Sequence, residues 1–132
     1  MAAVPRPGAL TLLVVDDSQF ARNRIQRAVA LRHVGRMVHA ANGREAIEAF
    51  RREQPDLVTM DLTMPELDGI AATTEMVRLR PDVRILVVSA LADKATAIEA
   101  LKRGACGFLL KPFDDLRLND ALALMMKGVG HG

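Results

Sequence analysis

The sequence has no tryptophan and no tyrosine, and it contains only four phenylalanines and one cysteine. Because no aromatic side chains are interleaved with the basic ones, we expect no direct binding to nucleic acid. The single Cys106 excludes an internal disulfide bond and fits a reducing compartment. No apolar run approaches the roughly 18 residues needed to span a bilayer, so we also expect no insertion into a membrane.

A chain of 132 residues is long enough for one domain with one hydrophobic core. We expect a disordered lead over residues 1–9, the domain over residues 10–126 and a flexible tail over residues 127–132. The segment MAAVPRPG at the start lacks the basic and apolar regions of a signal peptide, which predicts a cytoplasmic location.

The net charge is only +2, and the basic residues are scattered along the chain. The one local excess consists of Arg22, Arg24, Arg27 and Arg32, which share a predicted helix. We expect these arginines to form a solvated helix face, with docking to an acidic partner as the alternative.

Five short apolar runs alternate with segments of helical period. The runs cover residues 10–15, 36–40, 57–60, 83–88 and 107–110. Three of them, 10–15, 57–60 and 83–88, are continuously apolar, which is typical of strands covered on both faces of a parallel sheet. The alternation predicts an α/β fold, a doubly wound three-layer sandwich of (βα)5 order.

Apolar residues recur at helical spacing in the segments between these runs. In the helices expected over residues 18–31 and 93–103, the positions predicted to face the core are Phe20, Ile25, Ala28, Val29, Ile98 and Leu101. The last expected helix contains the stretch ALALMM (121–126), which is apolar nearly all round. Its surplus apolar residues are either ordinary surface residues or part of a contact face.

The central runs end in polar residues. They are the pair Asp16 and Asp17, then Asp61, Ser89 and Lys111. Taken singly, each has an ordinary explanation as a helix cap, a turn residue or a surface base. Taken together, they should meet at the carboxyl edge of the sheet, where ligands bind in such folds.

Three carboxylates at one edge repel one another unless a cation is present. Mg²⁺ binds a few carboxylate oxygens together with water and phosphate oxygens, so the cluster suggests Mg²⁺ and a phosphoryl group. Asp61 would then be the nucleophile, because a carboxylate can form an acyl phosphate. Lys111 would offset the charge on the transferring oxygens, and Ser89 would donate to one of them.

Four motifs together resemble the response-regulator receiver domain of two-component signalling. They are VVDDS (14–18), TMDLTMPELDG (59–69), VVSA (87–90) and GFLLKPF (107–113). The resemblance covers about residues 10–126. Within the family the sequence is most similar to the single-domain chemotaxis regulators, and the receiver of chemotaxis methylesterases comes next. The resemblance implies a five-stranded parallel sheet of order 2-1-3-4-5, the flavodoxin-like arrangement.

The resemblance also implies a role for each motif residue. Asp61 matches the phospho-accepting aspartate, and Asp16 and Asp17 match the acidic pair that holds Mg²⁺ with it. The backbone carbonyl of Thr63 completes that metal site in the family. The side chain at this position, together with Leu91, tunes the lifetime of the aspartyl phosphate. We expect the apolar Leu91 to shield the phosphoryl group from water and to lengthen its lifetime.

The remaining matches concern phosphate binding and the conformational switch. Ser89 matches the switch hydroxyl and Lys111 the lysine that pairs with phosphate. Phe108 matches the switch aromatic, although it can also be a core residue. The resemblance implies a cis peptide bond between Lys111 and Pro112.

The function implied is a phosphorylation switch rather than an enzyme that turns over an external substrate. The domain would take a phosphoryl group from a sensor histidine kinase in a self-catalysed transfer and lose it by autodephosphorylation. Its face of fourth helix, fifth strand and fifth helix would then bind a downstream target, in chemotaxis or motility signalling. Three alternatives remain, namely a receiver fragment of a larger regulator such as a chemotaxis methylesterase, a constitutive protein-binding receiver, and a phosphohydrolase of haloacid-dehalogenase type. Thr63 argues against the last, because that class has an acid/base aspartate at this place.

Overall fold

The fold is seen in a computed structural model that describes residues 8–64, 69–90 and 94–126. Five strands and five helices alternate along this part of the chain. The strands are β1 (Leu10–Val15), β2 (Val34–Ala40), β3 (Leu57–Asp61), β4 (Arg84–Ala90) and β5 (Gly107–Lys111). The helices are α1 (Gln19–Ala28), α2 (Gly43–Glu53), α3 (Gly69–Leu79), α4 (Lys94–Lys102) and α5 (Asp115–Met126). None of these helices has the length and apolar character required to cross a bilayer.

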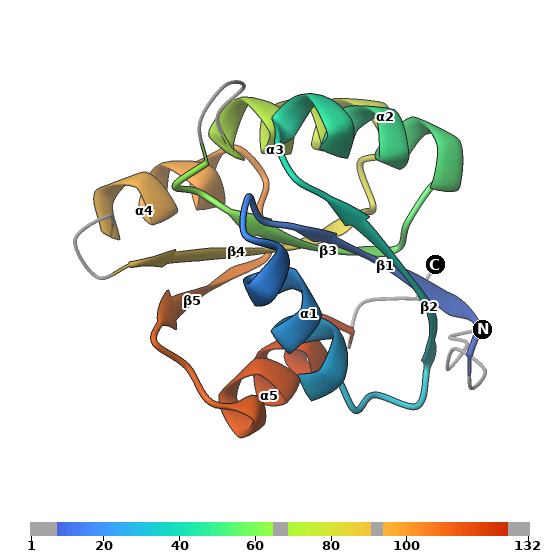
Figure 1. Ribbon diagram of the computed structural model, residues 1–132. Helices are drawn as coiled ribbons and strands as arrows, with labels where there is room; N and C mark the ends of the chain where they lie inside the picture. The colour runs from blue at the N-terminus through green and yellow to red at the C-terminus, as the bar shows by residue number, and fades with distance from the viewer. Residues whose placement is uncertain (1–7, 65–68, 91–93, 127–132) are drawn as a thin grey trace.

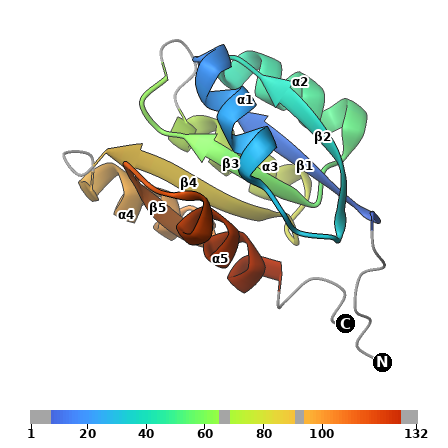
Figure 2. The ribbon, with the colours of Figure 1, turned by 60° about the horizontal axis from the view of Figure 1, so that its bottom comes forward.

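The strands form one parallel sheet in the order β2-β1-β3-β4-β5, which confirms the predicted topology. Helices α1 and α5 cover one face of this sheet, and α2, α3 and α4 cover the other (Figures 1 and 2). Alternate residues of one strand therefore enter different cores. In β1, Leu13 packs with the core under α2, α3 and α4, whereas Leu12 packs with the core under α1 and α5. This two-sided burial explains the continuous apolar runs of the central strands.

The predicted inward faces of α1 and α4 are partly wrong. Phe20 is 75% exposed and Ile98 is 44% exposed, although both were predicted to face the core. At about 100° per residue, Phe20 lies roughly 140° around the helix from the buried Ile25, so the two cannot share one face. In α4 the buried residues are Ala97 and Ala100 instead. Small residues therefore form the buried face of α4.

The start of α1 settles which residue caps it. Ser18 is the N-cap, and its hydroxyl accepts a hydrogen bond from the backbone N–H of Ala21 at 3.2 Å. The helix ends at Ala28, with Val29 as its C-cap, and so is shorter than the predicted segment 18–31. Because Ser18 satisfies the helix terminus, the side chain of Asp17 is not needed for capping and is exposed.

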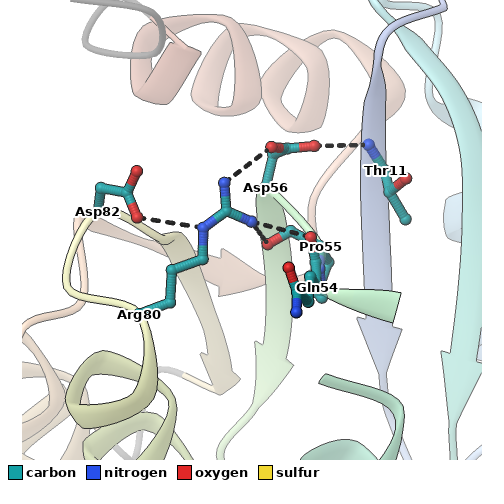
Figure 3. A network of polar contacts seen from close by, with 6 residues as sticks. All are labelled: Thr11, Gln54, Pro55, Asp56, Arg80 and Asp82. Carbon is teal, nitrogen blue, oxygen red and sulfur yellow. Dashed lines mark hydrogen bonds and ion pairs between the residues drawn. The ribbon is translucent and has the colours of Figure 1, made fainter. Parts of the chain in front are cut away.

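A network of polar contacts ties the elements together at the amino edge of the sheet (Figure 3). Asp56, directly before β3, accepts a hydrogen bond from the backbone N–H of Thr11 at 3.0 Å and one from Arg80 at 3.2 Å. The Arg80 guanidinium also donates to the backbone carbonyls of Gln54 and Pro55, at 2.8 and 2.9 Å. One arginine after α3 thus holds the connection between α2 and β3 in place.

Replacing Arg80 with alanine should lower the free energy of unfolding by about 1–3 kcal/mol, because two carbonyls and the carboxylates of Asp56 and Asp82 lose a donor. Urea denaturation measures the change. Arg78→Ala is the matched control, since the guanidinium of this exposed residue contacts only the partly exposed carboxylate of Glu75 among the described residues, and its loss should change stability little. Equal losses in the two variants would contradict the structural role of Arg80.

Candidate functional site

Three carboxylates meet where β1 and β3 end side by side. Asp16 and Asp17 follow β1, and Asp61 is the last residue of β3. One carboxylate oxygen from each of the three lies within 4.8 Å of the others. Asp16 and Asp61 are only 3% and 2% exposed, whereas Asp17 faces solvent. The cluster therefore offers a cation two buried ligands and one open side, which is a suitable arrangement for an ion that also keeps water or phosphate ligands.

Local hydrogen bonds fix the two buried carboxylates. Asp16 Oδ1 accepts from the backbone N–H of Ser18 at 2.9 Å. Asp61 Oδ1 accepts from the backbone N–H of Thr63 at 3.0 Å and from the Thr63 hydroxyl at 2.8 Å. Both hydrogen bonds go to the same oxygen, so Thr63 fixes the orientation of the Asp61 carboxylate through Oδ1.

Lys111 brings a positive charge to the same place. It is the last residue of β5, and its Nζ lies 3.7 Å from Asp16 Oδ2 and 3.7 Å from Asp61 Oδ1. The ammonium group thus bridges the two buried carboxylates. The peptide bond between Lys111 and Pro112 is cis.

Ser89 is buried beside this cluster. It lies in β4, one residue beyond Val88, which pairs with Asp61 of β3. Its side chain is 0% exposed, and its hydroxyl has no hydrogen-bond partner among the described residues. A buried hydroxyl without a partner is unfavourable, so its position at the rim suits a group that donates to a ligand oxygen.

Of the other predicted site residues, Phe108 and Thr63 lie within the described part of the chain. Phe108 lies in the edge strand β5 and is 38% exposed, so it is not a core residue. Thr63 is exposed, and its hydroxyl donates a hydrogen bond to Asp61 Oδ1. Leu91 lies outside the described residues.

Two arginines near the site were not foreseen as part of it. The expectation of a solvated helix face is wrong for Arg22, which donates to the backbone carbonyl of Asp16 at 2.6 Å. It is wrong for Arg24 as well, which donates to the backbone carbonyl of Phe113 at 2.7 Å. Both contacts join residues whose proximity no local sequence pattern indicates.

Burial is the main reason that the pKa of Asp16 is raised above 3.8, and the nearby Asp61 and Asp17 raise it further. The Ser18 N–H and Lys111 act in the opposite direction. Without a metal ion, the cluster therefore favours the protonated form of Asp16 at a pH where the unfolded chain would already be ionised.

This raised pKa predicts how the stability of the metal-free protein depends on pH. The folded state keeps the Asp16 proton to higher pH than the unfolded chain does, so the free energy of unfolding decreases as pH rises above about 3.8 through the folded-state pKa. Asp16→Asn should remove part of this decrease and be more stable than the wild type at neutral pH. Urea denaturation in EDTA at several pH values measures both effects. The same pH dependence in both proteins would contradict the prediction.

The comparisons with known proteins agree with the fold. Residues 12–123 match the family model of the response regulator receiver domain, and the chain therefore belongs to this family. It is similar to the chemotaxis protein CheY of Thermotoga maritima, with 40% identity over 116 residues that cover 88% of this chain and 97% of that protein. The chemotaxis protein CheY of Bacillus subtilis is 38% identical over 84% of this chain and 92% of its own length.

Longer proteins and solved structures also match this chain as a receiver domain. The chain is 41% identical to a protein-glutamate methylesterase of Photobacterium profundum over 90% of its own length, but spans only 31% of that protein. The structure of the receiver domain of AraT, a response regulator from Geobacillus stearothermophilus, matches with a TM-score of 0.85. That match has 25% identity and covers 91% of this chain and 95% of the other.

Proposed function

We propose that this receiver domain is a phosphorylation switch in which Asp61 accepts a phosphoryl group from the phosphohistidine of a sensor histidine kinase. The observation that carries the proposal is the position of Asp61 itself. Its carboxylate is 2% exposed, is oriented by Thr63, and lies next to two further carboxylates and the Lys111 ammonium. The proposed nucleophile, the proposed cation site and a positive charge thus lie together at one edge of the sheet.

The donor set suits Mg²⁺. Asp16, Asp17 and Asp61 would hold the ion through carboxylate oxygens, and the backbone carbonyl of Thr63 would add a further oxygen ligand. When bound, the ion offsets the negative charge of the carboxylates and of the transferring phosphoryl oxygens.

The transfer is a displacement at phosphorus. A carboxylate oxygen of Asp61 forms a bond to phosphorus while the bond between phosphorus and the imidazole nitrogen breaks. The electron pair of that bond stays with the imidazole, which leaves the site as neutral histidine after any proton transfer with solvent. The product is an aspartyl phosphate, and its later hydrolysis returns the carboxylate and inorganic phosphate. Lys111 stabilises the charge that accumulates on the phosphoryl oxygens during the transfer.

Ser89 and Phe108 would change position in response to the added phosphate. The Ser89 hydroxyl would donate to a phosphoryl oxygen, and the partly exposed Phe108 would turn inward, which changes the face made by α4, β5 and α5. A shift from 1:99 to 99:1 between two states requires about 5.5 kcal/mol of differential stabilisation. The exposed apolar residues Leu116 and Leu124 of α5 support a role of this helix in binding a target protein. The similarity to chemotaxis proteins favours a pathway in chemotaxis or motility.

Titration with beryllofluoride, which mimics a phosphoryl group on a carboxylate, tests the proposal. We expect Mg²⁺-dependent binding that shifts the NMR signals of Ser89, Phe108 and Lys111. A target captured from a lysate only in the presence of beryllofluoride and Mg²⁺ would identify the output. Failure to bind would instead favour a receiver that docks without phosphorylation.

A second candidate is that the domain acts as the receiver part of a longer regulator. The similarity to a methylesterase over about a third of that enzyme's length favours it. The same chemistry at Asp61 would then control an attached domain. The gene sequence around this chain distinguishes the two.

Ser89→Ala should separate signalling from stability. Because the hydroxyl lacks a partner among the described residues, we expect the free energy of unfolding to change by less than about 1 kcal/mol. Beryllofluoride should bind more weakly and leave Phe108 in its resting state. Thr73→Val is the matched control, since the hydroxyl of Thr73 in α3 is also buried and has no hydrogen-bond partner among the described residues. An unchanged response in Ser89→Ala would contradict the assigned role.

A further inference from the structure

The connection between β5 and α5 is held by a residue of α1. Arg24 donates from a guanidinium nitrogen to the backbone carbonyl of Phe113 at 2.7 Å. Its guanidinium also lies over the Phe113 ring, 5.0 Å from the ring centroid, and forms an ion pair of 3.8 Å with Asp115. Three different contacts of one side chain thus fix the segment that directly follows Lys111.

Strand pairing does not support this segment beyond Lys111. Strand β5 is at the edge of the sheet, and Lys111 is its last residue paired with β4. The next residue, Pro112, has no N–H to donate. Beyond Lys111 the backbone is therefore no longer held by strand pairing. Two residues later, Arg24 contacts it at the carbonyl of Phe113.

Packing supports the segment only in part: Phe113 is partly buried against the core under α1 and α5, but Pro112 is exposed. An open hollow of about 550 Å³ lies between α1 and this connection, with Ile25, Pro112 and Phe113 among its walls. Lys111 and Asp16 line the same hollow. Without the contacts of Arg24, the backbone after Lys111 has room to move, and the ammonium group would move with it.

We propose that Arg24 is a positioning residue for phosphoryl transfer and acts through Lys111. It sets where the Lys111 ammonium lies between Asp16 and Asp61, at 3.7 Å from each carboxylate. This role rests on the proposed function, because Lys111 matters for the reaction only if Asp61 is phosphorylated. The planar guanidinium is needed for it, since a lysine cannot combine the carbonyl contact with stacking on the ring.

The chain offers a matched control in Asn119. This residue of α5 donates to the backbone carbonyl of Ala28 at 2.8 Å and accepts from the backbone N–H of Ala30 at 2.7 Å. It ties α5 to the end of α1, whereas Arg24 ties the start of α5 to the middle of that helix. Asn119→Ala therefore weakens the same pair of helices without touching the segment after Lys111.

The experiment compares wild type, Arg24→Ala, Arg24→Lys and Asn119→Ala. For each we would measure the rate of phosphorylation by acetyl phosphate, the affinities for Mg²⁺ and beryllofluoride, and the free energy of unfolding. Arg24→Ala should be phosphorylated at least about tenfold more slowly and bind beryllofluoride more weakly, because a displacement of about 1 Å can reduce a rate on the order of a hundredfold. Arg24→Lys should restore little of the rate. Asn119→Ala should be less stable but react at the wild-type rate.

A double-mutant cycle with Lys111→Met shows whether the effect passes through Lys111. If it does, Arg24→Ala should cause no further loss of rate in the Lys111→Met background. Independent, multiplicative losses would overturn the proposal, and so would a wild-type rate in Arg24→Ala or an equal loss in Asn119→Ala. A wild-type protein that takes no phosphoryl group would instead refute the proposed function itself.

Discussion

Asp61→Asn should take up no label from acetyl phosphate, whereas the wild type is labelled in the presence of Mg²⁺. The substitution keeps the size of the side chain and an oxygen that accepts from Thr63, so the fold should be preserved. It removes the carboxylate that forms the acyl phosphate, and an amide is not a nucleophile of comparable strength. Labelling with radioactive acetyl phosphate, followed by gel electrophoresis, measures the result.

Asp82→Asn is the control for this experiment. Asp82 is a surface carboxylate, 77% exposed in its side chain, that pairs with Arg80 at the opposite edge of the sheet. Its replacement should leave labelling unchanged. Label that persists in Asp61→Asn would show that another residue accepts the phosphoryl group and would end the assignment.

Lys111→Met should slow phosphorylation by roughly a hundredfold to a thousandfold, which is the usual effect of removing one group that stabilises transition-state charge. Mg²⁺ affinity should not fall, because the lost ammonium lies 3.7 Å from two carboxylates and repels a cation at the same site. Slow transfer with undiminished metal binding is therefore the expected signature. Stopped-flow rates with acetyl phosphate and calorimetric Mg²⁺ titration provide the two measurements.

Lys102→Met removes one positive charge from the exposed end of α4 and serves as the control. It should react like the wild type, because a surface charge away from the cluster is screened by salt. If Lys111→Met also reacts at the wild-type rate, the ammonium group has no part in the transfer.

The sheet and the edge at which its polar residues meet were predictable because both follow from local patterns. Continuous apolar runs indicated central parallel strands, and the polar residues after them had to meet at one edge. Asp16, Asp61, Ser89 and Lys111 are indeed brought to that edge, three of them buried. Topology alone converts their separate positions in the sequence into a site.

The contacts that adjust the site were not predictable in this way. Arg24 and Phe113 are 89 positions apart in the sequence, and no periodicity relates them. The inward assignment of Phe20 is wrong because this residue lies roughly 140° around the helix from the buried Ile25. Arginines on a helix ordinarily indicate a solvated face, so the carbonyl groups that Arg22 and Arg24 reach become visible only in the folded chain.

The central claim is that Asp61, and neither of its two acidic neighbours, carries the phosphoryl group. Borohydride reduces an acyl phosphate to an alcohol and so converts a phosphorylated aspartate into homoserine, which peptide mass spectrometry can locate. After treatment with acetyl phosphate and Mg²⁺, we predict homoserine at position 61 alone, and none when EDTA replaces the metal. Homoserine at Asp16 or Asp17, or at no position in a protein that is fully folded and metal-bound, would contradict the account.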